Sequence, residues 1–364
     1  MSNQSIFIIA EAGVNHNGSV DMALQLVDEA AKAGADAVKF QTFKSEAVIS
    51  RFAVKAEYQK QTTGEEDTQL EMVRRLELDV LAHKRIRDRC LQRNIQFLST
   101  PFDLGSLHLL INEFDLPIIK IPSGEITNAP FLIEIAKTGK ELILSTGMST
   151  LGEIETALGI LAFGALMSDA KPSQDSFRQA YESDAGQSVL KERITLLHCT
   201  TEYPAPLDQV NLMAIDTMRQ AFGLPVGYSD HTEGIAVSIA AVALGACVIE
   251  KHFTLDRNLP GPDHQASLEP RELFELVKGI RAIELAKGSA KKIAVASERA
   301  NRTVARKSLV ALTQVKKGES FTLDNLGCKR PGHGISPLNY WNVLGTISDR
   351  DYAEDETIST SVKF

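Results

Sequence analysis

The sequence has few cysteines and no long apolar run, and these absences exclude several classes of protein. Its four cysteines, Cys90, Cys199, Cys247 and Cys328, are widely spaced and form no C-x-x-C pair. We therefore expect buried thiols in a reducing compartment rather than a disulfide framework. No apolar run approaches the roughly 18 residues of a membrane span, and the N-terminal residues do not resemble a signal peptide. These features predict a cytoplasmic protein with no membrane partner.

The sequence also has no excess of positive charge. Its 39 Lys and Arg residues are outnumbered by 47 Asp and Glu residues, which gives a formal net charge of -8 at pH 7. A nucleic-acid-binding domain would carry a basic face, so we expect no nucleic-acid partner. The loop GVNHNGS, at residues 13–19, lacks the glycine spacing of a dinucleotide or Walker-type motif. A small anionic substrate stays compatible with this composition, because a few local lysines suffice to hold a phosphate.

Short apolar runs alternate with amphipathic helical patterns through the larger part of the chain. The runs begin at Ile6, Asp36, Ile95, Pro117, Glu141, Ile194, Pro225 and Ala246. Continuous apolar strands that alternate with helices are typical of a parallel sheet covered by helices. Eight such units predict an α/β protein with a (β/α)8 TIM barrel at residues 1–286. A doubly wound open sheet is the alternative.

The amino-acid composition changes after the predicted barrel. Residues 287–302 are small or charged and are expected to form a linker. Residues 303–364 contain short strand patterns and frequent turns, which predict a small, mainly β domain. Two insertions interrupt the barrel pattern. We expect residues 45–78 to form a loop with a helix over the site and residues 163–193 to form a peripheral excursion, with surface decoration as the alternative for both.

Each predicted strand ends in polar or reactive residues. In chain order these are Glu11, Lys39 with Gln41, Ser99 with Thr100, Lys120 with Ser123, Ser145 with Thr146, His198 with Thr200, Ser229 with His231, and Glu250 with His252. A TIM barrel builds its active site from the C-terminal ends of its strands. The pattern therefore predicts one funnel-shaped site.

Two histidines end the seventh and eighth predicted strands. Adjacent strands lie about 4.8 Å apart, so His231 and His252 are placed to meet at one metal ion. A site with two imidazole ligands leaves positions open for water and substrate. The alternative is a pair of hydrogen-bonded core histidines.

Lys39 and Lys120 lie within otherwise apolar runs. A buried lysine is costly unless it faces an opposite charge. An internal salt bridge satisfies that requirement, and so does an anionic ligand. The hydroxyls of Thr100, Ser123 and Ser145 are suited to phosphate and carboxylate oxygens. Phosphoenolpyruvate matches this set.

Three carboxylates, Glu11, Glu125 and Asp263, stand near strand ends or in the loops that follow them. Near a metal ion and an anionic substrate, such groups orient water or transfer protons. Each of them alone fits a capping or salt-bridging role equally well.

The motifs AEAGVNHNGS, VKFQTFK, LSTPFD, KIPSGE, LSTGM, HCTTEYPAP, GYSDHT, EKHFTLD, GPDH and KRPGHGISP occur in this order. This series resembles the N-acetylneuraminate (sialic acid) synthase family, which includes legionaminic acid synthases. The resemblance runs from about Phe7 to the C-terminus. It implies a TIM barrel followed by an antifreeze-like (SAF) domain, in a homodimer whose SAF domains reach over the partner barrels. It also implies phosphoenolpyruvate, an N-acylated amino sugar and a divalent metal, with Mn2+ favoured and Mg2+ or Co2+ as alternatives.

The resemblance also assigns roles to individual positions. His231 and His252 resemble metal ligands. The phosphoenolpyruvate contacts correspond to Lys39, Thr100, Lys120, Ser123 and Ser145, and Thr201 stands where some members have an asparagine near the phosphate. Ser229 is a further expected substrate-binding residue. Glu11, Glu125, Tyr203, Glu250 and Asp263 fall at positions that handle the sugar and protons. Arg330 resembles an arginine that reaches the N-acyl group across the dimer.

The expected reaction condenses phosphoenolpyruvate with N-acetylmannosamine and water to give N-acetylneuraminate and phosphate. Glu125 or Glu250 would orient the water, and Glu11 or Asp263 would assist proton transfer. One alternative is a legionaminic acid synthase that uses 2,4-diacetamido-2,4,6-trideoxymannose. Another is a non-catalytic glycan-binding protein with a degenerate barrel, which the complete polar set at the strand ends argues against.

Overall fold

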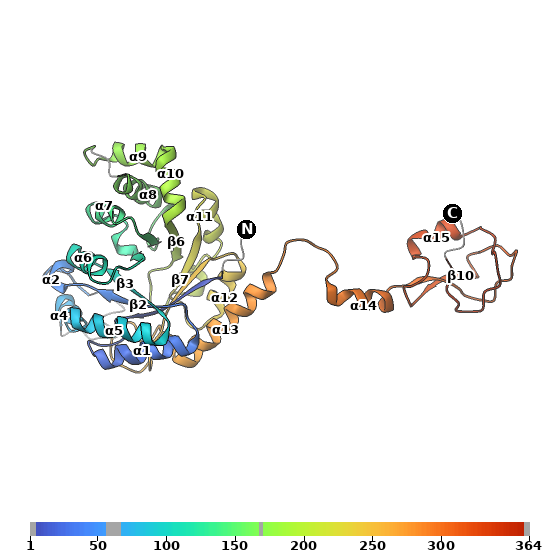
Figure 1. The fold of residues 1–364 in the computed structure, drawn as a ribbon, viewed down its shortest axis with the longest axis horizontal. Coiled ribbons are helices and arrows are strands. Elements are labelled where there is room, and N and C mark those ends of the chain that lie inside the picture. The colour runs from blue at the N-terminus through green and yellow to red at the C-terminus, as the bar shows by residue number, and fades with distance from the viewer. Residues whose placement is uncertain (1–4, 56–66, 167–169, 360–364) are drawn as a thin grey trace. The chain divides into compact units, whose positions relative to one another are not determined.

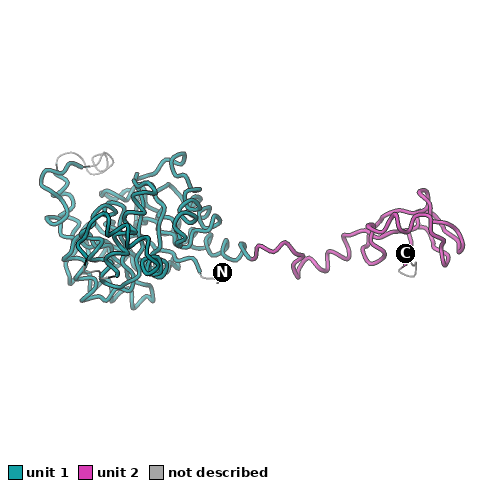
Figure 2. The backbone as a smooth tube through the Cα atoms, turned by 90° about the horizontal axis from the view of Figure 1, so that it is seen from above, with its two compact units in different colours: residues 1–288 teal, residues 289–364 magenta. Residues whose placement is uncertain are grey.

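The chain divides into two compact units, which Figure 2 distinguishes by colour. The computed structural model describes residues 5–55, 67–166 and 170–359. Unit 1 is Met1–Gly288 and unit 2 is Ser289–Phe364. Each unit has its own hydrophobic core, so each is described separately.

Unit 1 is built on eight parallel strands. They are β1 (Phe7–Gly13), β2 (Ala37–Thr42), β3 (Gln96–Pro101), β4 (Ile118–Ile121), β5 (Glu141–Ser145), β6 (Ile194–Cys199), β7 (Val226–Asp230) and β8 (Val248–His252). Their order in the sheet is β3-β2-β1-β8-β7-β6-β5-β4, and β3 contacts β4. Because β1 pairs with β8 and the two end strands β3 and β4 lie in contact, the eight strands form a nearly closed TIM barrel. The predicted fold is confirmed, and the alternative of an open doubly wound sheet is excluded.

Helices surround the strands of unit 1, as Figure 1 shows. They are α1 (Val20–Ala33), α2 (Ser45–Val48), α4 (Gln69–Arg74), α5 (Val80–Arg93), α6 (Leu104–Asn112), α7 (Ala129–Lys137), α8 (Leu151–Ala165), α9 (Gln174–Glu182), α10 (Asp184–Arg193), α11 (Ala214–Phe222), α12 (Ala236–Ala243) and α13 (Pro270–Lys287), with short 3-10 turns η1 (Ser123–Glu125) and η2 (Leu207–Gln209). Local signals set their ends. The Ser19 side chain accepts a hydrogen bond from the backbone N–H of Met22, and Gly34 ends α1 with φ 82°.

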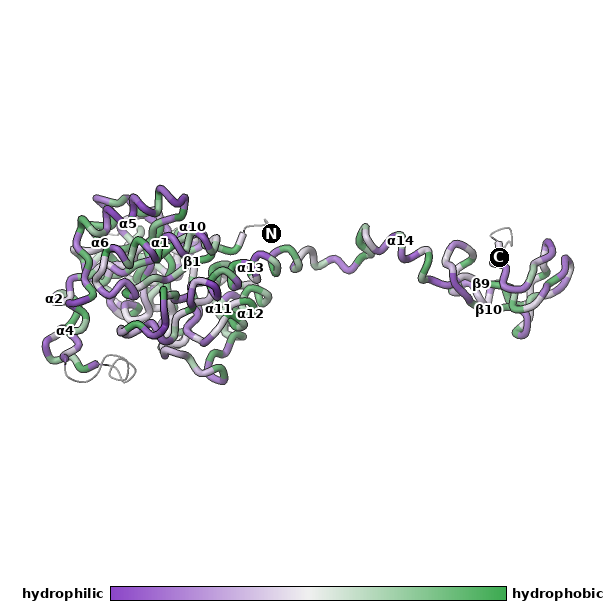
Figure 3. Tube along the Cα trace, turned by 90° about the horizontal axis from the view of Figure 1, so that it is seen from below, coloured by the Kyte–Doolittle hydropathy of each residue, from purple (hydrophilic) through white to green (hydrophobic). Residues whose placement is uncertain are grey.

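Hydrophobic and hydrophilic residues alternate along the outer helices, as Figure 3 shows for α1 and α5. Their apolar faces pack on the outer face of the strands and form the main core. A second, smaller layer fills the barrel interior and consists of Ile9, Ala37, Leu98, Ile143, Leu197 and Val248. Five of these six residues lie two positions before a polar residue of the strand ends, as Ile9 precedes Glu11, and these polar residues are called the polar layer; Leu197 instead precedes Cys199. Because strand side chains alternate with period two, both layers point inward, and the polar layer lies at the C-terminal end.

The two insertions fold differently. The first contains α2 and α4, and its residues 56–66 lie outside the described part of the chain. The second contains α9 and α10, which pack against α8 on the outside of the barrel. Among the described residues, no helix is long and apolar enough to cross a membrane. The four cysteines are all unpaired.

Unit 2 begins with α14 (Ala296–Ala305), so part of the expected linker is helical. The antiparallel pair β9 (Ser308–Ala311) and β10 (Leu326–Lys329) follows, with the turn η3 (Pro337–Asn339) and the short helix α15 (Tyr340–Val343). A core that includes Leu309, Phe321, Leu326 and Tyr352 holds these segments together. This small, mainly β arrangement is the one predicted for the C-terminal domain.

Candidate active site

The register of the barrel strands brings the predicted site residues together. Glu11 is paired with Lys39 on β2 and with His252 on β8. On the next strand, Ser229 is paired with Glu250. Residues paired across parallel strands point to the same side of the sheet, so all five side chains point into the barrel mouth.

A cavity of about 290 Å³ opens at these strand ends. Thirteen of the fifteen predicted site residues line it: Glu11, Lys39, Thr100, Lys120, Ser123, Ser145, Thr201, Tyr203, Ser229, His231, Glu250, His252 and Asp263. Most ligand pockets have volumes of about 300–1,000 Å³, so the cavity is at the small end of this range. It suits a small substrate in a largely formed site.

Two lysines and two glutamates form the floor of the cavity. The Lys120 ammonium lies 2.8 Å from Oε1 of Glu250, and the Lys39 ammonium lies 3.6 Å from Oε2 of the same carboxylate. Lys39 also forms an ion pair with Glu11 and donates a hydrogen bond to Oγ1 of Thr100 at 2.9 Å. The internal salt bridges considered from the sequence are therefore present, and the cavity opens directly above them.

Burial and charge act against each other in this floor. Burial disfavours the Lys39 ammonium, but Glu11 and Glu250 outweigh it and raise the Lys39 pKa. Burial likewise opposes ionisation of Glu250, yet Lys120 and Lys39 lower its pKa well below the usual range. For Glu11, burial and the nearby Glu250 charge exceed the effect of Lys39 and raise the pKa to about 7. The floor thus holds the Lys39 ammonium charged beside one firmly ionised carboxylate, with which Lys120 also pairs.

The two histidines lie side by side above Glu250. Their ring centroids are 5.7 Å apart, and the Tyr203 ring lies 4.1 Å from that of His231. Nδ1 of His231 donates a hydrogen bond to the carbonyl of Thr200 at 2.6 Å, which leaves the lone pair on Nε2. Nδ1 of His252 is buried without a hydrogen-bond partner and lies 4.0 Å from a carboxylate oxygen of Asp263.

Both imidazoles are neutral near pH 7. Burial lowers the pKa of His231 to about 4, and burial together with the neighbouring His231 holds that of His252 well below its usual value. Burial raises the pKa of Asp263 to about 6. Neutral imidazole is the form that binds a metal ion, and the unpartnered Nδ1 of His252 fits such a role. Among the described residues, no group of three or more His, Cys, Asp or Glu side chains is arranged to hold a metal. A bound ion would therefore take its other ligands from water or substrate.

A group of small hydroxyls lies beside Lys120. Ser123 accepts a hydrogen bond from the backbone N–H of Gly147 at 2.9 Å. The hydroxyls of Ser145 and Thr201 are buried and have no hydrogen-bond partner among the residues that the structure describes. Buried unpartnered donors next to a lysine are suited to oxygen atoms of a phosphate or carboxylate.

The remaining two predicted residues are not brought to this cavity. Glu125 lies in η1 and accepts a hydrogen bond from the side chain of Asn128 at 2.7 Å, away from the cavity lining. Arg330 belongs to unit 2, where its guanidinium donates a hydrogen bond to the carbonyl of Ala305 at 3.0 Å. Their proposed roles stay predictions.

Sequence reasoning missed part of the lining. Gln41, named with Lys39 at the end of its strand, does line the cavity, and Phe43 follows it by two more residues, so alternation was a usable signal for the missed Phe43. Val48, Met72 and Leu76 come from the first insertion. Nothing in their local pattern indicates that they face the site, because their placement depends on how the insertion folds back.

Comparisons with known proteins were made against families, curated proteins and solved structures. The NeuB family matches residues 26–292, and the SAF domain matches residues 306–361. The N,N'-diacetyllegionaminic acid synthase of Campylobacter jejuni subsp. jejuni serotype O:2 is 54% identical over 96% of this chain and 98% of that protein. The N,N'-diacetyllegionaminic acid synthase of Legionella pneumophila subsp. pneumophila is 44% identical over 95% and 91% of the two chains. The crystal structure of N-acetylneuraminic acid (sialic acid) synthetase from Leptospira borgpetersenii serovar Hardjo-bovis, in complex with citrate, is 35% identical with a TM-score of 0.65, over 82% of this chain and 90% of that one.

Proposed function

This chain belongs to the NeuB family, and on that premise we propose that it condenses phosphoenolpyruvate with 2,4-diacetamido-2,4,6-trideoxymannose to give N,N'-diacetyllegionaminic acid and phosphate. The class of reaction follows from membership of the family. The chain is a phosphoenolpyruvate-dependent transferase of the N-acetylneuraminate synthase type that forms a C–C bond. The family resemblance inferred from the motif series is confirmed.

The choice of sugar rests on the named relatives. Two proteins at 54% and 44% identity are N,N'-diacetyllegionaminic acid synthases, whereas the sialic acid synthetase is 35% identical. These identities favour the diacetamido sugar, which was the alternative from the sequence. N-acetylmannosamine, the first expectation, is kept as the second candidate because the sialic acid synthetase matches across most of its length.

One observation supports the reaction above all others: in one cavity, two lysines and two hydroxyls that have no hydrogen-bond partner in the described part of the chain lie beside two neutral histidines. Lys39, Lys120 and Thr100 bind the anionic groups of phosphoenolpyruvate. The hydroxyls of Ser123, Ser145 and Thr201 donate further hydrogen bonds to the same groups. This binding holds C3 of phosphoenolpyruvate against the aldehyde carbon of the open-chain sugar. Proximity in a fixed orientation is the main contribution of these residues.

His231 and His252 would hold the divalent metal, for which we propose Mn2+, with Mg2+ or Co2+ as alternatives. When bound, the ion supplies Lewis-acid polarisation of the aldehyde oxygen. The chain contributes the orientation of the imidazoles, since the Thr200 carbonyl fixes the tautomer of His231.

The reaction forms a C–C bond between C3 of phosphoenolpyruvate and the aldehyde carbon. Water then adds to C2, and phosphate leaves with cleavage of the C2–O bond. The added water gives up two protons. One is taken up by the former aldehyde oxygen and the other by the phosphate that leaves. Glu250 lies in the cavity floor between the two lysines and would orient the water, while Glu11 and Asp263 are the buried acids available for proton transfer.

Phosphate release tests the proposal directly. Phosphoenolpyruvate and Mn2+ are mixed with the full chain and with one of three sugars: 2,4-diacetamido-2,4,6-trideoxymannose, N-acetylmannosamine or N-acetylmannosamine 6-phosphate. We expect the diacetamido sugar to give the highest kcat/KM. A higher value for N-acetylmannosamine would replace the proposed sugar by the second candidate, and no release with any sugar would reject the reaction.

We also propose a homodimer in which the SAF domain of one chain reaches over the barrel of the other. Arg330 would then contact the N-acyl group of a sugar bound by the partner chain. This arrangement gives a role to a charged residue whose side chain, among the described residues of its own unit, donates a hydrogen bond to a backbone carbonyl. Arg330→Ala is expected to raise the KM of the sugar while leaving that of phosphoenolpyruvate unchanged.

A further inference from the structure

One side of the cavity is a hydrophobic cluster that the reaction described above does not use. It consists of Val14, Phe43, Val48, Val73, Leu76 and Phe102, and is called the apolar wall here. All six residues line the cavity. The cluster is separate from the barrel core, and Val48, Val73 and Phe102 remain partly exposed. A partly exposed apolar surface inside a substrate cavity is suited to an apolar part of the substrate.

The position of the apolar wall relates it to the far end of the sugar. Lys39, Gln41 and Phe43 all line the cavity and succeed one another along β2 and its continuation. Two residues of a strand cover about 6.6 Å. Phe43 follows Lys39 by two such steps, so it lies further toward the mouth of the cavity than the lysine floor. Phe43 also packs edge-on against Phe102, with ring centroids 6.2 Å apart. Because the proposed function places phosphoenolpyruvate on the lysine floor, the open-chain sugar that meets it would extend toward the mouth, where Phe43 and Phe102 line the cavity.

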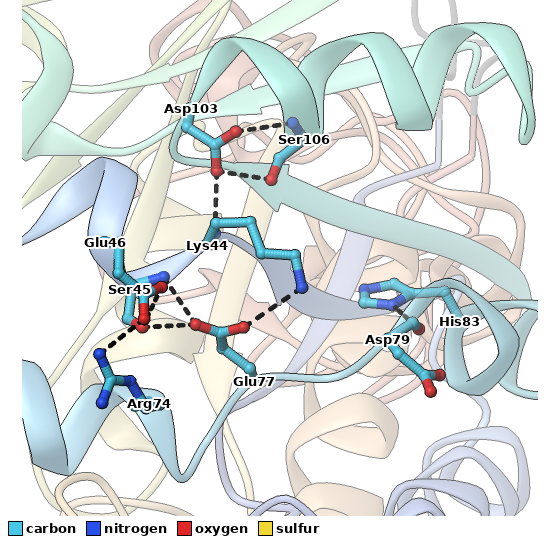
Figure 4. Close-up of polar contacts among 9 residues, drawn as sticks. All are labelled: Lys44, Ser45, Glu46, Arg74, Glu77, Asp79, His83, Asp103 and Ser106. Carbon is cyan, nitrogen blue, oxygen red and sulfur yellow. Dashed lines mark hydrogen bonds and ion pairs between the residues drawn. The ribbon is translucent and has the colours of Figure 1, made fainter.

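Polar contacts hold the insertion that supplies half of the apolar wall, as Figure 4 shows. Glu77 accepts hydrogen bonds from the backbone N–H of Ser45 at 2.7 Å and from the Lys44 ammonium at 3.2 Å. Arg74 on α4 pairs with Glu46 on α2 at 2.6 Å. These contacts join the start of α2 to the end of α4, between which Val48 and Val73 are positioned.

The same segment is also attached to the barrel. One carboxylate oxygen of Asp103 accepts a hydrogen bond from the backbone N–H of Lys44 at 3.0 Å, and its other oxygen caps α6 through the N–H of Ser106 at 2.8 Å. The apolar wall is therefore a built part of the cavity.

The charges in the cavity exclude one kind of substrate from this region. Among the described residues that line the cavity, Lys39 and Lys120 are the only lysines or arginines, and both contact Glu250 in the floor. A phosphate on the last sugar carbon would lie against apolar side chains with no cation beside it. Burial of such a charge without a partner is strongly unfavourable.

We propose that the apolar wall is the subsite for the methyl group at C6 of the sugar, and that it selects a 6-deoxy sugar over one with a hydroxymethyl or phosphorylated carbon there. The inference rests on the proposed function and adds the feature of the substrate that is recognised. A methyl group has no hydrogen bonds to water that binding would remove. A hydroxyl at the same place loses its hydrogen bonds to water. We expect kcat/KM to be about 10- to 100-fold higher for the 6-deoxy sugar than for the sugar with a hydroxyl at C6, which is the usual limit for a hydrophobic pocket that meets an added hydroxyl.

Four sugars separate this inference from the proposed function. They are mannose derivatives with a 2-acetamido group that carry either acetamido or hydroxyl at C4 and either hydrogen or hydroxyl at C6. The C4 comparison tests the proposed function, and the C6 comparison tests the apolar wall. We expect the full chain with Mn2+ to give a higher kcat/KM for the 6-deoxy sugar in both C4 pairs. Equal values within each C4 pair would overturn the inference, even where the C4 preference supports the proposed function.

Val73→Thr changes the polarity of the apolar wall at almost constant volume. We expect it to reduce the C6 preference by about 3- to 10-fold, mainly through a higher KM for the 6-deoxy sugars. Val54→Thr is the matched control, because Val54 belongs to the same insertion but is exposed and does not line the cavity. Val48→Thr is a second variant if Val73→Thr does not fold. A C6 preference that survives both wall variants, or that Val54→Thr reduces equally, would contradict the proposal.

Discussion

Asp230 and Lys251 form a buried ion pair behind the two candidate metal ligands. The carboxylate and the ammonium are 3.1 Å apart, and the two residues are partners in the register of β7 and β8. Each immediately precedes a histidine of the cavity, His231 or His252. Because side chains alternate along a strand, the ion pair lies on the opposite side of the barrel wall from the imidazoles. The pair therefore fixes the two strand ends from which the histidines project.

Asp230→Asn should strongly destabilise unit 1. The change leaves the Lys251 ammonium buried without a countercharge, which typically costs about 3–5 kcal/mol. Far-UV circular dichroism during urea unfolding measures the loss, since the single tryptophan, Trp341, lies in unit 2. Asp175→Asn is the control, because its pair with Arg178 is exposed at 3.1 Å and should contribute at most about 1 kcal/mol. Similar losses in both variants would show that the buried pair has no special role.

His231→Ala should abolish metal-dependent turnover while the fold remains intact. Residues behind a metal ligand commonly contribute about 10- to 100-fold to metal affinity, so loss of a ligand itself should exceed this. Isothermal titration with Mn2+ and phosphate release at increasing Mn2+ concentration provide two separate readouts. His108→Ala serves as the control, because His108 is exposed on α6. Normal Mn2+ binding by His231→Ala would contradict the metal assignment.

The sequence predicted the barrel and its floor because both depend on short-range patterns. Parallel strands buried on both faces produce the continuous apolar runs, and for all inner apolar residues but Leu197 the polar residue two positions further on marks the C-terminal end of the strand. Leu98 before Thr100 and Val248 before Glu250 illustrate this step. The register that joins Glu11 to both Lys39 and His252 then follows from closure of the barrel.

The apolar wall could not be predicted from these short-range patterns. Val73 and Leu76 are separated from Phe43 by about thirty residues of irregular sequence, and no periodic pattern predicts that they meet it. Polar contacts such as that between Glu77 and Ser45 decide how this insertion folds back. Glu125 failed to reach the cavity for a related reason: it lies in a 3-10 turn, where strand alternation no longer determines the direction of a side chain.

The position of Glu77 predicts a pH-dependent contribution to stability. Partial burial opposes its ionisation, but hydrogen bonds from Ser45 and the contact with Lys44 outweigh this and lower its pKa below the usual 4.5. A carboxyl with a depressed folded-state pKa stabilises the fold fully above its unfolded pKa, and the effect disappears as the pH falls through the folded value. Glu77→Gln should therefore be less stable than the wild type at pH 7, and the difference should narrow as the pH falls below 4.5.

Urea unfolding of both proteins at several pH values between 7 and about 3, where an ordinary carboxyl is protonated, measures this difference. Hydrogen bonds to a charged group contribute about 1.5–3 kcal/mol, which sets the expected gap at pH 7. Glu134→Gln removes a carboxylate from an exposed pair with Lys137 and should give a smaller gap at pH 7. A gap for Glu77→Gln that stays constant over the whole pH range would refute the assignment.

Gly147→Ala should impair phosphoenolpyruvate binding through a purely steric effect. A Cβ at this position would lie 2.2 Å from Oγ1 of Thr201 and 2.9 Å from Oγ of Ser123, so one or both hydroxyls must move. Misplacement of binding groups by about 1 Å can reduce activity up to 100-fold, and we expect the KM for phosphoenolpyruvate to rise by about 10-fold or more. Gly152→Ala is the matched control, because a Cβ there meets no atom within 4 Å. Initial rates at varied phosphoenolpyruvate and saturating sugar measure the effect. An unchanged KM in Gly147→Ala would mean that phosphoenolpyruvate does not depend on the hydroxyls of Ser123 and Thr201.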